Sequence, residues 1–146
     1  MTISLMGILF AISAPIFAEF QTSSRLKSSS QIVETVFGEA FSSARSRPEC
    51  FVVSGEGSVL KLENFDFKNR QCAEQAKISR KFQLNSGVSF KKDFKVKFKP
   101  PFGDIEIGDD EKDVLEIKMC NEECVFFQVN KKSGLFSRVA NPNEDE

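Results

Sequence analysis

The hydrophobic pattern of the chain changes near Pro48. Before that residue, apolar side chains recur at every third or fourth position between Ile32 and Ala44, which is typical of one face of a helix. Residues 21–31 contain no Gly or Pro that would interrupt the helix, whereas Pro48 disfavours helical geometry in the residue before it. The pattern predicts one helix over residues 2–47, roughly 70 Å long at 1.5 Å per residue.

The start of this helix is uncharged and strongly apolar. No charged residue occurs between Met1 and Ala18, and this length lies at the lower edge of the roughly 17 to 25 residues that span a bilayer as a helix. The stretch therefore predicts a membrane segment, which Pro15 should kink or loosen. A secretory signal peptide cleaved after Ala18 is the alternative, although no basic residue precedes the apolar run.

After Pro48 the pattern becomes that of short strands. Two apolar runs, 50–53 and 59–62, flank a glycine-rich turn and predict a hairpin. In residues 94–99 Phe and Val alternate with Lys, so Phe is expected in the core and Lys in solvent. Residues 69–81 are polar and predict a loop or a short helix. Further strands are expected at Ile105–Ile107, Val114–Met119, Val125–Val129 and Leu135–Val139.

These elements predict an α+β fold in which a long, partly transmembrane N-terminal helix packs on a small antiparallel β-sheet or sandwich. We divide the chain into a hydrophobic half of the helix, residues 1–24, an amphipathic half, residues 25–47, and a β-rich head domain, residues 48–146. A chain of 146 residues and 16.4 kDa has room for one head domain of ordinary size.

Composition argues against an enzyme. The chain has no His, Trp or Tyr but 16 Phe, so imidazole-based catalysis and imidazole metal sites cannot be built. Its net charge of -1 hides an asymmetry, because residues 1–100 carry 15 Lys and Arg against 9 Asp and Glu, whereas residues 101–146 carry 5 against 12. The chain is therefore dipolar along its length.

Four cysteines, Cys50, Cys72, Cys120 and Cys124, behind an apolar leader indicate an oxidising compartment and two disulfides. Four cysteines allow three pairings. A bridge between Cys120 and Cys124 across a hairpin is sterically plausible, and Cys50 with Cys72 then follows by elimination. A zinc site is the competing interpretation, but one pair with three intervening residues and no His is a poor match to zinc spacing. Four reduced buried thiols are the third possibility.

The N-terminal stretch resembles a known family. Residues 7–17 read Gly-Ile-Leu-Phe-Ala-Ile-Ser-Ala-Pro-Ile-Phe, which is similar to the G-I-L-A-A-I-A-I-P-x-F stretch of type IV pilins and type II secretion pseudopilins, with the same Gly-to-Pro spacing. In the family, a basic leader, a peptidase site and a glutamate precede this stretch. Aligned on Gly7 and Pro15, they would fall upstream of Met1, so we expect either an internal start or a trimmed chain.

Three later segments resemble the H-type minor pseudopilins, the GspH/FimT family. They are FSSAR in residues 40–47, VKFKPPFG in residues 96–103 and VNKKSGLFSR in residues 129–138. The resemblance implies a structural subunit of a type II secretion, type IV pilus or competence filament, with the helix in the inner membrane, the head in the periplasm or outside the cell, and other subunits and the assembly machinery as partners. The expected helix-packing residues are Leu5, Gly7, Ile8, Leu9, Ile12, Pro15, Ile16 and Phe20.

Two charged segments could carry binding chemistry. Acidic residues around Gly108 could ligate calcium, although they lack the EF-hand spacing and a solvated acidic turn is the favoured interpretation; they are Asp104, Asp109, Asp110, Glu111 and Asp113. A basic run interleaved with Phe could bind DNA, but the alternation places Phe in the core and residues 141–146 are acidic, so nucleic acid is not the expected partner. Its cations are Lys77, Arg80, Lys81, Lys91, Lys92, Lys95, Lys97 and Lys99.

No catalytic residue and no cofactor is expected. Apart from a filament subunit, the sequence leaves open two functions, a secreted disulfide-bonded β binding module and a DNA-binding minor pilin.

Overall fold

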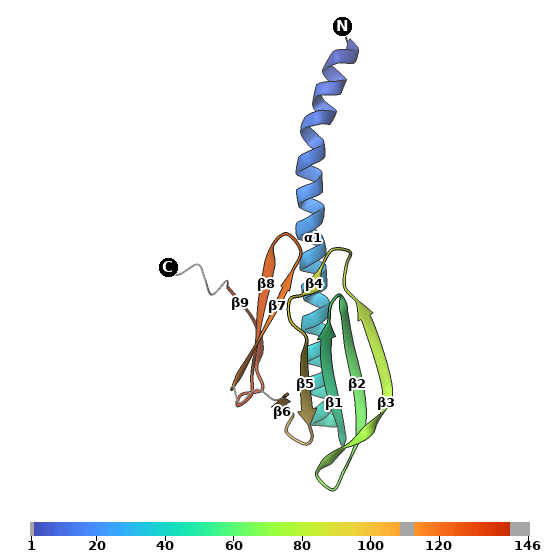
Figure 1. Ribbon diagram of the computed structural model, residues 1–146, viewed down its shortest axis with the longest axis vertical. Coiled ribbons are helices and arrows are strands. Elements are labelled where there is room, and N and C mark those ends of the chain that lie inside the picture. Colours follow the sequence, from blue (N-terminus) through green and yellow to red (C-terminus); the bar gives the residue numbers. More distant parts are fainter. Residues whose placement is uncertain (1, 109–112, 141–146) are drawn as a thin grey trace.

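The computed structural model describes residues 2–108 and 113–140, with side chains described from Phe20 onward. A single long helix, α1 (Thr2–Ser46), leads into the strands of a head domain (Figure 1). The strands are β1 (Glu49–Glu56), β2 (Val59–Lys68), β3 (Gln71–Gln83), β4 (Ser89–Phe90), β5 (Phe94–Lys99), β6 (Asp104–Ile107), β7 (Val114–Cys120), β8 (Cys124–Asn130) and β9 (Phe136–Val139).

Helix α1 presents one apolar stripe to the head. It ends at Ser46, two residues before Pro48, as expected for a residue type that disfavours helix before it. The buried positions follow three- and four-residue spacing, which keeps them on one face. They are Leu26, Ser29, Ser30, Val33, Val36, Phe37, Ala40 and Ala44.

The strands form two antiparallel sheets. Sheet A has five strands in the order β3-β2-β1-β5-β6, and sheet B has four in the order β4-β7-β8-β9. The hairpin predicted from residues 50–62 is confirmed, because β1 pairs with β2 from Glu49↔Asp66 to Glu56↔Val59. The alternation predicted for residues 94–99 is also confirmed, since the Phe and Val side chains of β5 are buried and Lys95 is exposed.

Phe37 connects the helix to both sheets. Its ring stacks on Phe136 of β9 with centroids 4.3 Å apart and also lies 6.0 Å from Phe94 and 6.2 Å from Phe98 of β5. Phe37 is 1% exposed, so this one side chain of the helix is buried between the two sheets and packs on both.

One predicted element is wrong. Residues 69–81 were expected to form a loop or a short helix, but β3 runs from Gln71 to Gln83. Eleven of its 13 residues are exposed and the other two are half-buried, so the strand has no apolar face that a pattern could show. Pairing with β2, from Val59↔Gln83 to Lys68↔Gln71, holds it in the sheet.

The predicted fold class is also wrong. Over the residues with described side chains, the chain has about 27 helical residues and is about 52% strand, arranged as two antiparallel sheets. The helix there carries one apolar stripe and a polar remainder, which is the composition of a helix packed on a head domain and not of a membrane span. The division at residues 24 and 47 stays a prediction.

Candidate functional site: the helix and its junctions with the sheets

Helix α1 extends well beyond the head domain. Figure 1 shows its first half projecting from the end of the head at which β4 and the β7–β8 turn lie. The side-chain hydrogen bond nearest the N-terminus that joins helix to head runs from Asn121 Nδ2 to the carbonyl of Thr22, at 2.9 Å. The preceding twenty helical residues, 2–21, therefore form the projecting part of α1.

Two asparagines fasten the helix where it enters the head. Asn121 lies in the β7–β8 turn and donates to Thr22. Asn85 follows β3, and its Nδ2 donates to the carbonyl of Arg25 at 3.1 Å, while its backbone N–H donates to Ser29 Oγ at 3.1 Å. One loop from each sheet thus holds the same two turns of helix, which fixes the direction of the projecting segment relative to the head.

Small side chains permit this close approach. Ser29 and Ser30 are 0% and 1% exposed, and Ser30 Oγ donates to the carbonyl of Leu26 at 2.8 Å. Buried hydroxyl groups need partners, and Ser29 finds its partner in Asn85, fifty-six residues away. Helix propensity alone marks these serines as weak helix formers, so sequence reasoning missed their role at this junction.

A second junction lies at the other end of the head, around Phe41. Gly103 and Gly134 both have left-handed backbones, with φ of 74° and 71°. A Cβ at Gly103 would lie 3.0 Å from Phe41 Cε2, and one at Gly134 would lie 2.8 Å from the same atom. The guanidinium of Arg45 lies over the same ring, with its Cζ 5.4 Å from the ring centroid. Phe41 is half-buried, and two loops border it at positions that only glycine occupies without strain.

The junction around Phe41 brings together the three segments on which the minor-pseudopilin resemblance depends. Phe41 and Arg45 belong to the first, Gly103 to the second and Gly134 to the third. Successive segments are about 30 to 60 residues apart in the sequence, since Arg45, Gly103 and Gly134 are separated by 58 and 31 residues, yet they meet at one end of the head. Their shared role is to attach the last turns of α1 to both sheets.

Of the predicted helix-packing residues, Phe20 is the one whose side chain the structure describes, and it is 71% exposed. A large apolar side chain this exposed at the base of the projecting segment is available for packing against another molecule. The others, Leu5, Gly7, Ile8, Leu9, Ile12, Pro15 and Ile16, lie outside the residues with described side chains.

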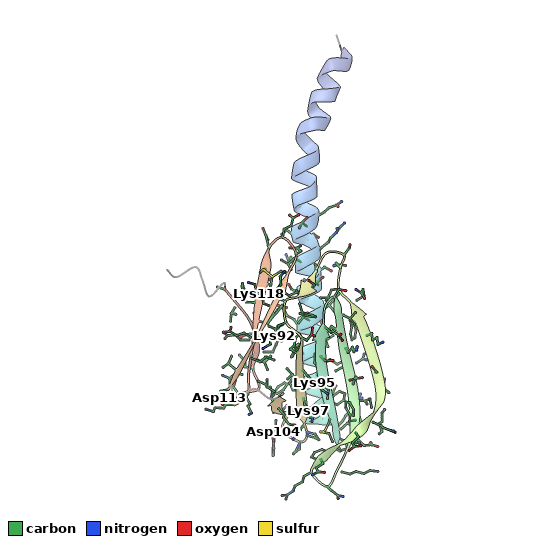
Figure 2. All side chains as sticks on the ribbon, in the orientation of Figure 1. Lys92, Lys95, Lys97, Asp104, Asp113 and Lys118 are labelled. Carbon is green, nitrogen blue, oxygen red and sulfur yellow. A yellow bond between two sulfur atoms is a disulfide. The ribbon has the colours of Figure 1, made fainter. Side chains whose placement is uncertain are left out.

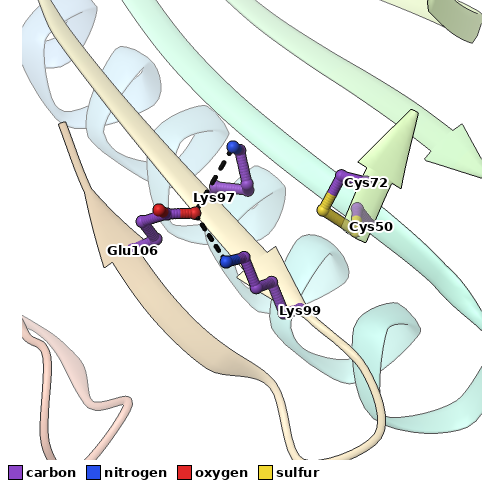
Figure 3. Close-up of a disulfide and its surroundings, with 5 residues drawn as sticks. All are labelled: Cys50, Cys72, Lys97, Lys99 and Glu106. Carbon is purple, nitrogen blue, oxygen red and sulfur yellow. Dashed lines mark ion pairs between the residues drawn. A yellow bond between two sulfur atoms is a disulfide. The ribbon is translucent and has the colours of Figure 1, made fainter. Parts of the chain in front are cut away.

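The basic run is partly neutralised within sheet A. Glu106 of β6 forms ion pairs with two lysines of β5: its Oε2 lies 2.9 Å from Lys99 Nζ and 3.3 Å from Lys97 Nζ (Figure 3). The hydrogen bond from Lys99, together with the two positive charges, holds the pKa of Glu106 below its ordinary 4.5. Two lysines that could have met DNA phosphates therefore already face a carboxylate of their own chain.

Other cations of the run have partners too. Lys77 Nζ lies 2.6 Å from Asp66 Oδ1 and 3.2 Å from Glu49 Oε1, and the hydrogen bond from Lys77 lowers the pKa of Asp66. Arg80 pairs with Glu39 of the helix. These pairs fasten β3 to its neighbours. They leave four cations of the run without an ion pair among the described residues: Lys81, Lys91, Lys92 and Lys95.

The expected calcium ligands are not gathered in the described part of the chain. Asp104 and Asp113 are exposed, and Figure 2 labels them near the lower end of the head. Asp113 binds Lys132 Nζ at 2.7 Å, and this hydrogen bond lowers its pKa. Asp109, Asp110 and Glu111 lie outside the described residues. Within the described ranges, no three His, Cys, Asp or Glu side chains are placed to hold a metal ion.

Both disulfides that the sequence favours are present. Cys50 is joined to Cys72, which ties the start of β3 to β1 (Figure 3). Cys120 is joined to Cys124 at the β7–β8 turn. The second disulfide lies beside Asn121, the residue that donates to Thr22. It therefore constrains the turn that holds the helix.

Comparison with known proteins gives no relative. No family model, no curated protein and no solved structure matches the chain.

The prediction that the N-terminal helix spans the inner membrane is contradicted. Over the residues whose side chains are described, no helix combines the length and apolar character needed to cross a membrane. The expected location in the inner membrane, with a periplasmic or extracellular head, is therefore not supported.

Proposed function

We propose that the protein is a structural subunit that assembles with further copies, or with related subunits, through its N-terminal helix, in the manner of the pilins and pseudopilins that residues 7–17 resemble. The observation that carries this proposal is the projection of residues 2–21 of α1 beyond both sheets. Residues 1–18 contain no charge. An uncharged apolar helix is stable in water only when other apolar surface covers it, and the head of the same chain does not extend over it.

Two features suit the projecting segment to assembly. The hydrogen bonds from Asn85 and Asn121 fix its direction at the point where it leaves the head, so every copy presents it in the same orientation. Phe20, exposed at its base, adds a large apolar side chain next to the head. Helices that carry such surfaces associate by interlocking their side chains.

The proposal is tested by replacing one apolar residue in the projecting segment of the full chain. Ile12→Asp places a carboxylate where apolar packing is required, so it should abolish the association that persists in 500 mM NaCl, measured by sedimentation velocity, and remove any filaments seen by electron microscopy. Ser24→Asp, at an exposed position of the helix beside the head, is the matched control and should leave both unchanged. A monomeric wild-type chain, or unaltered association of the Ile12→Asp variant, would contradict the proposal.

A second candidate is a secreted disulfide-bonded β binding module, which the two disulfides favour. This function requires cleavage after Ala18, which removes the apolar residues 1–18. Mass spectrometry of the protein isolated from its native host separates the two functions, because a mature chain that begins at Glu19 lacks the segment that the assembly needs.

A further inference from the structure

Three lysines lie in one row across sheet A. Ser54 of β1 is in register with Lys61 of β2 on one side and with Lys95 of β5 on the other, and Lys61 is in register with Lys81 of β3. We call Lys81, Lys61 and Lys95 the lysine row. Directly paired strand residues point to the same face of a sheet, so the three side chains leave sheet A together.

The lysine row lies on the face of sheet A that is turned away from the helix. Lys61 stands between the buried Leu60 and Leu62, and Lys95 between the buried Phe94 and Val96. Those four neighbours belong to the core that sheet A shares with α1. Because side chains alternate along a strand, the lysines point in the opposite direction, into solvent.

This row has no ion pair within the described part of the chain, and the carboxylate that shares its face on β2 is Glu63, two positions from Lys61. Lys97, on the same strand as Lys95, is paired with Glu106, and Lys77, on the same strand as Lys81, is paired with Asp66 and Glu49. None of the three row lysines has an ion pair among the described residues. Like charges on directly opposed strand positions destabilise a sheet, and Lys61 faces Lys81, so the fold itself gains nothing from this arrangement.

The shape of the surface indicates an extended anionic ligand. Strands lie about 4.8 Å apart, so the row spans roughly 14 Å from β3 to β5 across the sheet. Lys95 borders a hollow together with Asp93 and Asp113, whereas Lys61 and Lys81 line none of the five hollows described next to the strands and helix. Small-molecule sites are concave, so a row of three cations that lies largely on open sheet surface suits a short run of carboxylates.

The chain itself contains such a run. Residues 144–146 are Glu-Asp-Glu, three consecutive carboxylates, and residues 101–146 as a whole carry 12 acidic against 5 basic residues. The described strand before this run, β9, belongs to sheet B, and its Phe136 packs on Phe37 of the helix. The side chain of Phe136 therefore faces the helix, while the lysine row is on the far face of sheet A.

We propose that the lysine row binds residues 144–146 of a second copy of the chain. The contact joins two different surfaces, so each copy can use its row and its acidic segment on different neighbours, and repetition builds a ring or an open series of subunits. This inference deepens the proposed function and rests on it, because it supplies a second, electrostatic contact between subunits that already meet through their helices.

The test uses charge reversal in the full chain. A row variant, Lys61→Glu with Lys81→Glu and Lys95→Glu, and a tail variant, Glu144→Lys with Asp145→Lys and Glu146→Lys, should each weaken association about 10-fold in 50 mM NaCl, as expected for three exposed ion pairs. Mixing the two variants should restore association, because the reversed row then meets the reversed tail. Sedimentation velocity from 50 to 500 mM NaCl gives the readout, since exposed ion pairs are screened at high salt.

A control variant carries the same change of charge elsewhere. Lys68, Lys91 and Lys92 are exposed, lie off the row and have no ion pair among the described residues, so their replacement by Glu should leave the salt-sensitive association within about 2-fold of wild type. Circular dichroism of every variant checks that the fold persists. An equal loss in this control and in the row variant would overturn the proposal, since it would reduce the effect to net charge.

Other outcomes also decide the matter. Failure of the mixed variants to associate would overturn the proposal, as would a tail variant that associates like wild type. A row that binds a short DNA duplex while the tail variant assembles normally would assign the row to nucleic acid and also overturn it. Ile12→Asp distinguishes the two proposals: it removes the salt-insensitive helix contact and leaves the salt-sensitive contact, so failure of one is seen separately from failure of the other.

Discussion

Replacing Gly134 with Ala should destabilise the head more than the same change at a glycine of equal backbone geometry. Gly134 has φ of 71°, and a Cβ there would lie 2.8 Å from Phe41 Cε2. Gly57 has φ of 56° and no atom within 4 Å of its Cβ position, so it is the matched control. Both substitutions force alanine into the left-handed region, and the one at Gly134 also forces it against the ring of Phe41.

The expected magnitudes follow from these two contributions. Left-handed backbone costs alanine about 1 to 2 kcal/mol of unfolding free energy, and this cost applies at both sites. Overpacking adds about 1 to 3 kcal/mol, and it applies at Gly134 alone. Gly103 and Arg45 stand close to the same ring, which limits the directions in which Phe41 can move aside. The difference between the variants should therefore be about 1 to 3 kcal/mol, or roughly 3 to 9 °C in Tm for a chain of this size.

Thermal and urea denaturation, followed by circular dichroism with the disulfides intact, measure this difference. A double-mutant cycle with Phe41→Ala separates the contact from the backbone, because removing the ring should return the cost of Gly134→Ala to that of Gly57→Ala. Equal losses at Gly134 and Gly57 would refute the reasoning. Additive effects of Phe41→Ala and Gly134→Ala, within about 0.5 kcal/mol, would do the same, since residues in contact should show coupling.

Three further changes test the head domain. Phe37→Ala should cost about 3 to 5 kcal/mol of unfolding free energy, because its buried ring packs on both sheets, and urea denaturation against Phe126→Ala, which is half-buried, measures it. Replacing Cys50 and Cys72 with Ser opens a 22-residue separation and should cost about 3 kcal/mol, more than the same change at Cys120 and Cys124, separated by 4; equal losses in thermal melts would contradict this. The pKa of Glu106 is lowered in the folded state, so its pairing stabilises the fold above its ordinary pKa of 4.5 and is lost as the pH falls through the lower folded value. Glu106→Gln should flatten that part of the stability profile, and an unchanged profile would show that the pairing contributes nothing.

The sequence predicted the elements that have an apolar face. The helix and β5 were recognised because their buried residues recur with periods near 3.6 and 2, and these periods survive in the burial of Val33, Phe37, Phe94 and Phe98. An apolar face of this kind comes from the spacing of residues within one short segment, so a few neighbouring residues are enough to predict it.

Elements without such a face could not be predicted. β3 is exposed on both sides, and its strand geometry depends on hydrogen bonds to β2 and on the pairing of Lys77 with Asp66. The contacts of the candidate site could not be predicted either. Ser29 joins the helix to the head by accepting a hydrogen bond from Asn85. The lysine row forms because the pairing of β3, β2, β1 and β5 aligns its three lysines. Each depends on partners distant in sequence, which local patterns do not specify.

The continuity of α1 has a mechanical consequence. The same helix that projects from the head also runs through its core to the junction at Phe41, so tension applied to residues 2–21 is carried along the helix axis into the head. There it acts as shear between the buried stripe of α1 and the two sheets. Contacts from Leu26 to Ala44 share this load at the same time and are not peeled apart one by one. The head should therefore resist pulling through its N-terminal segment better than pulling through β9, a four-residue strand at the edge of sheet B.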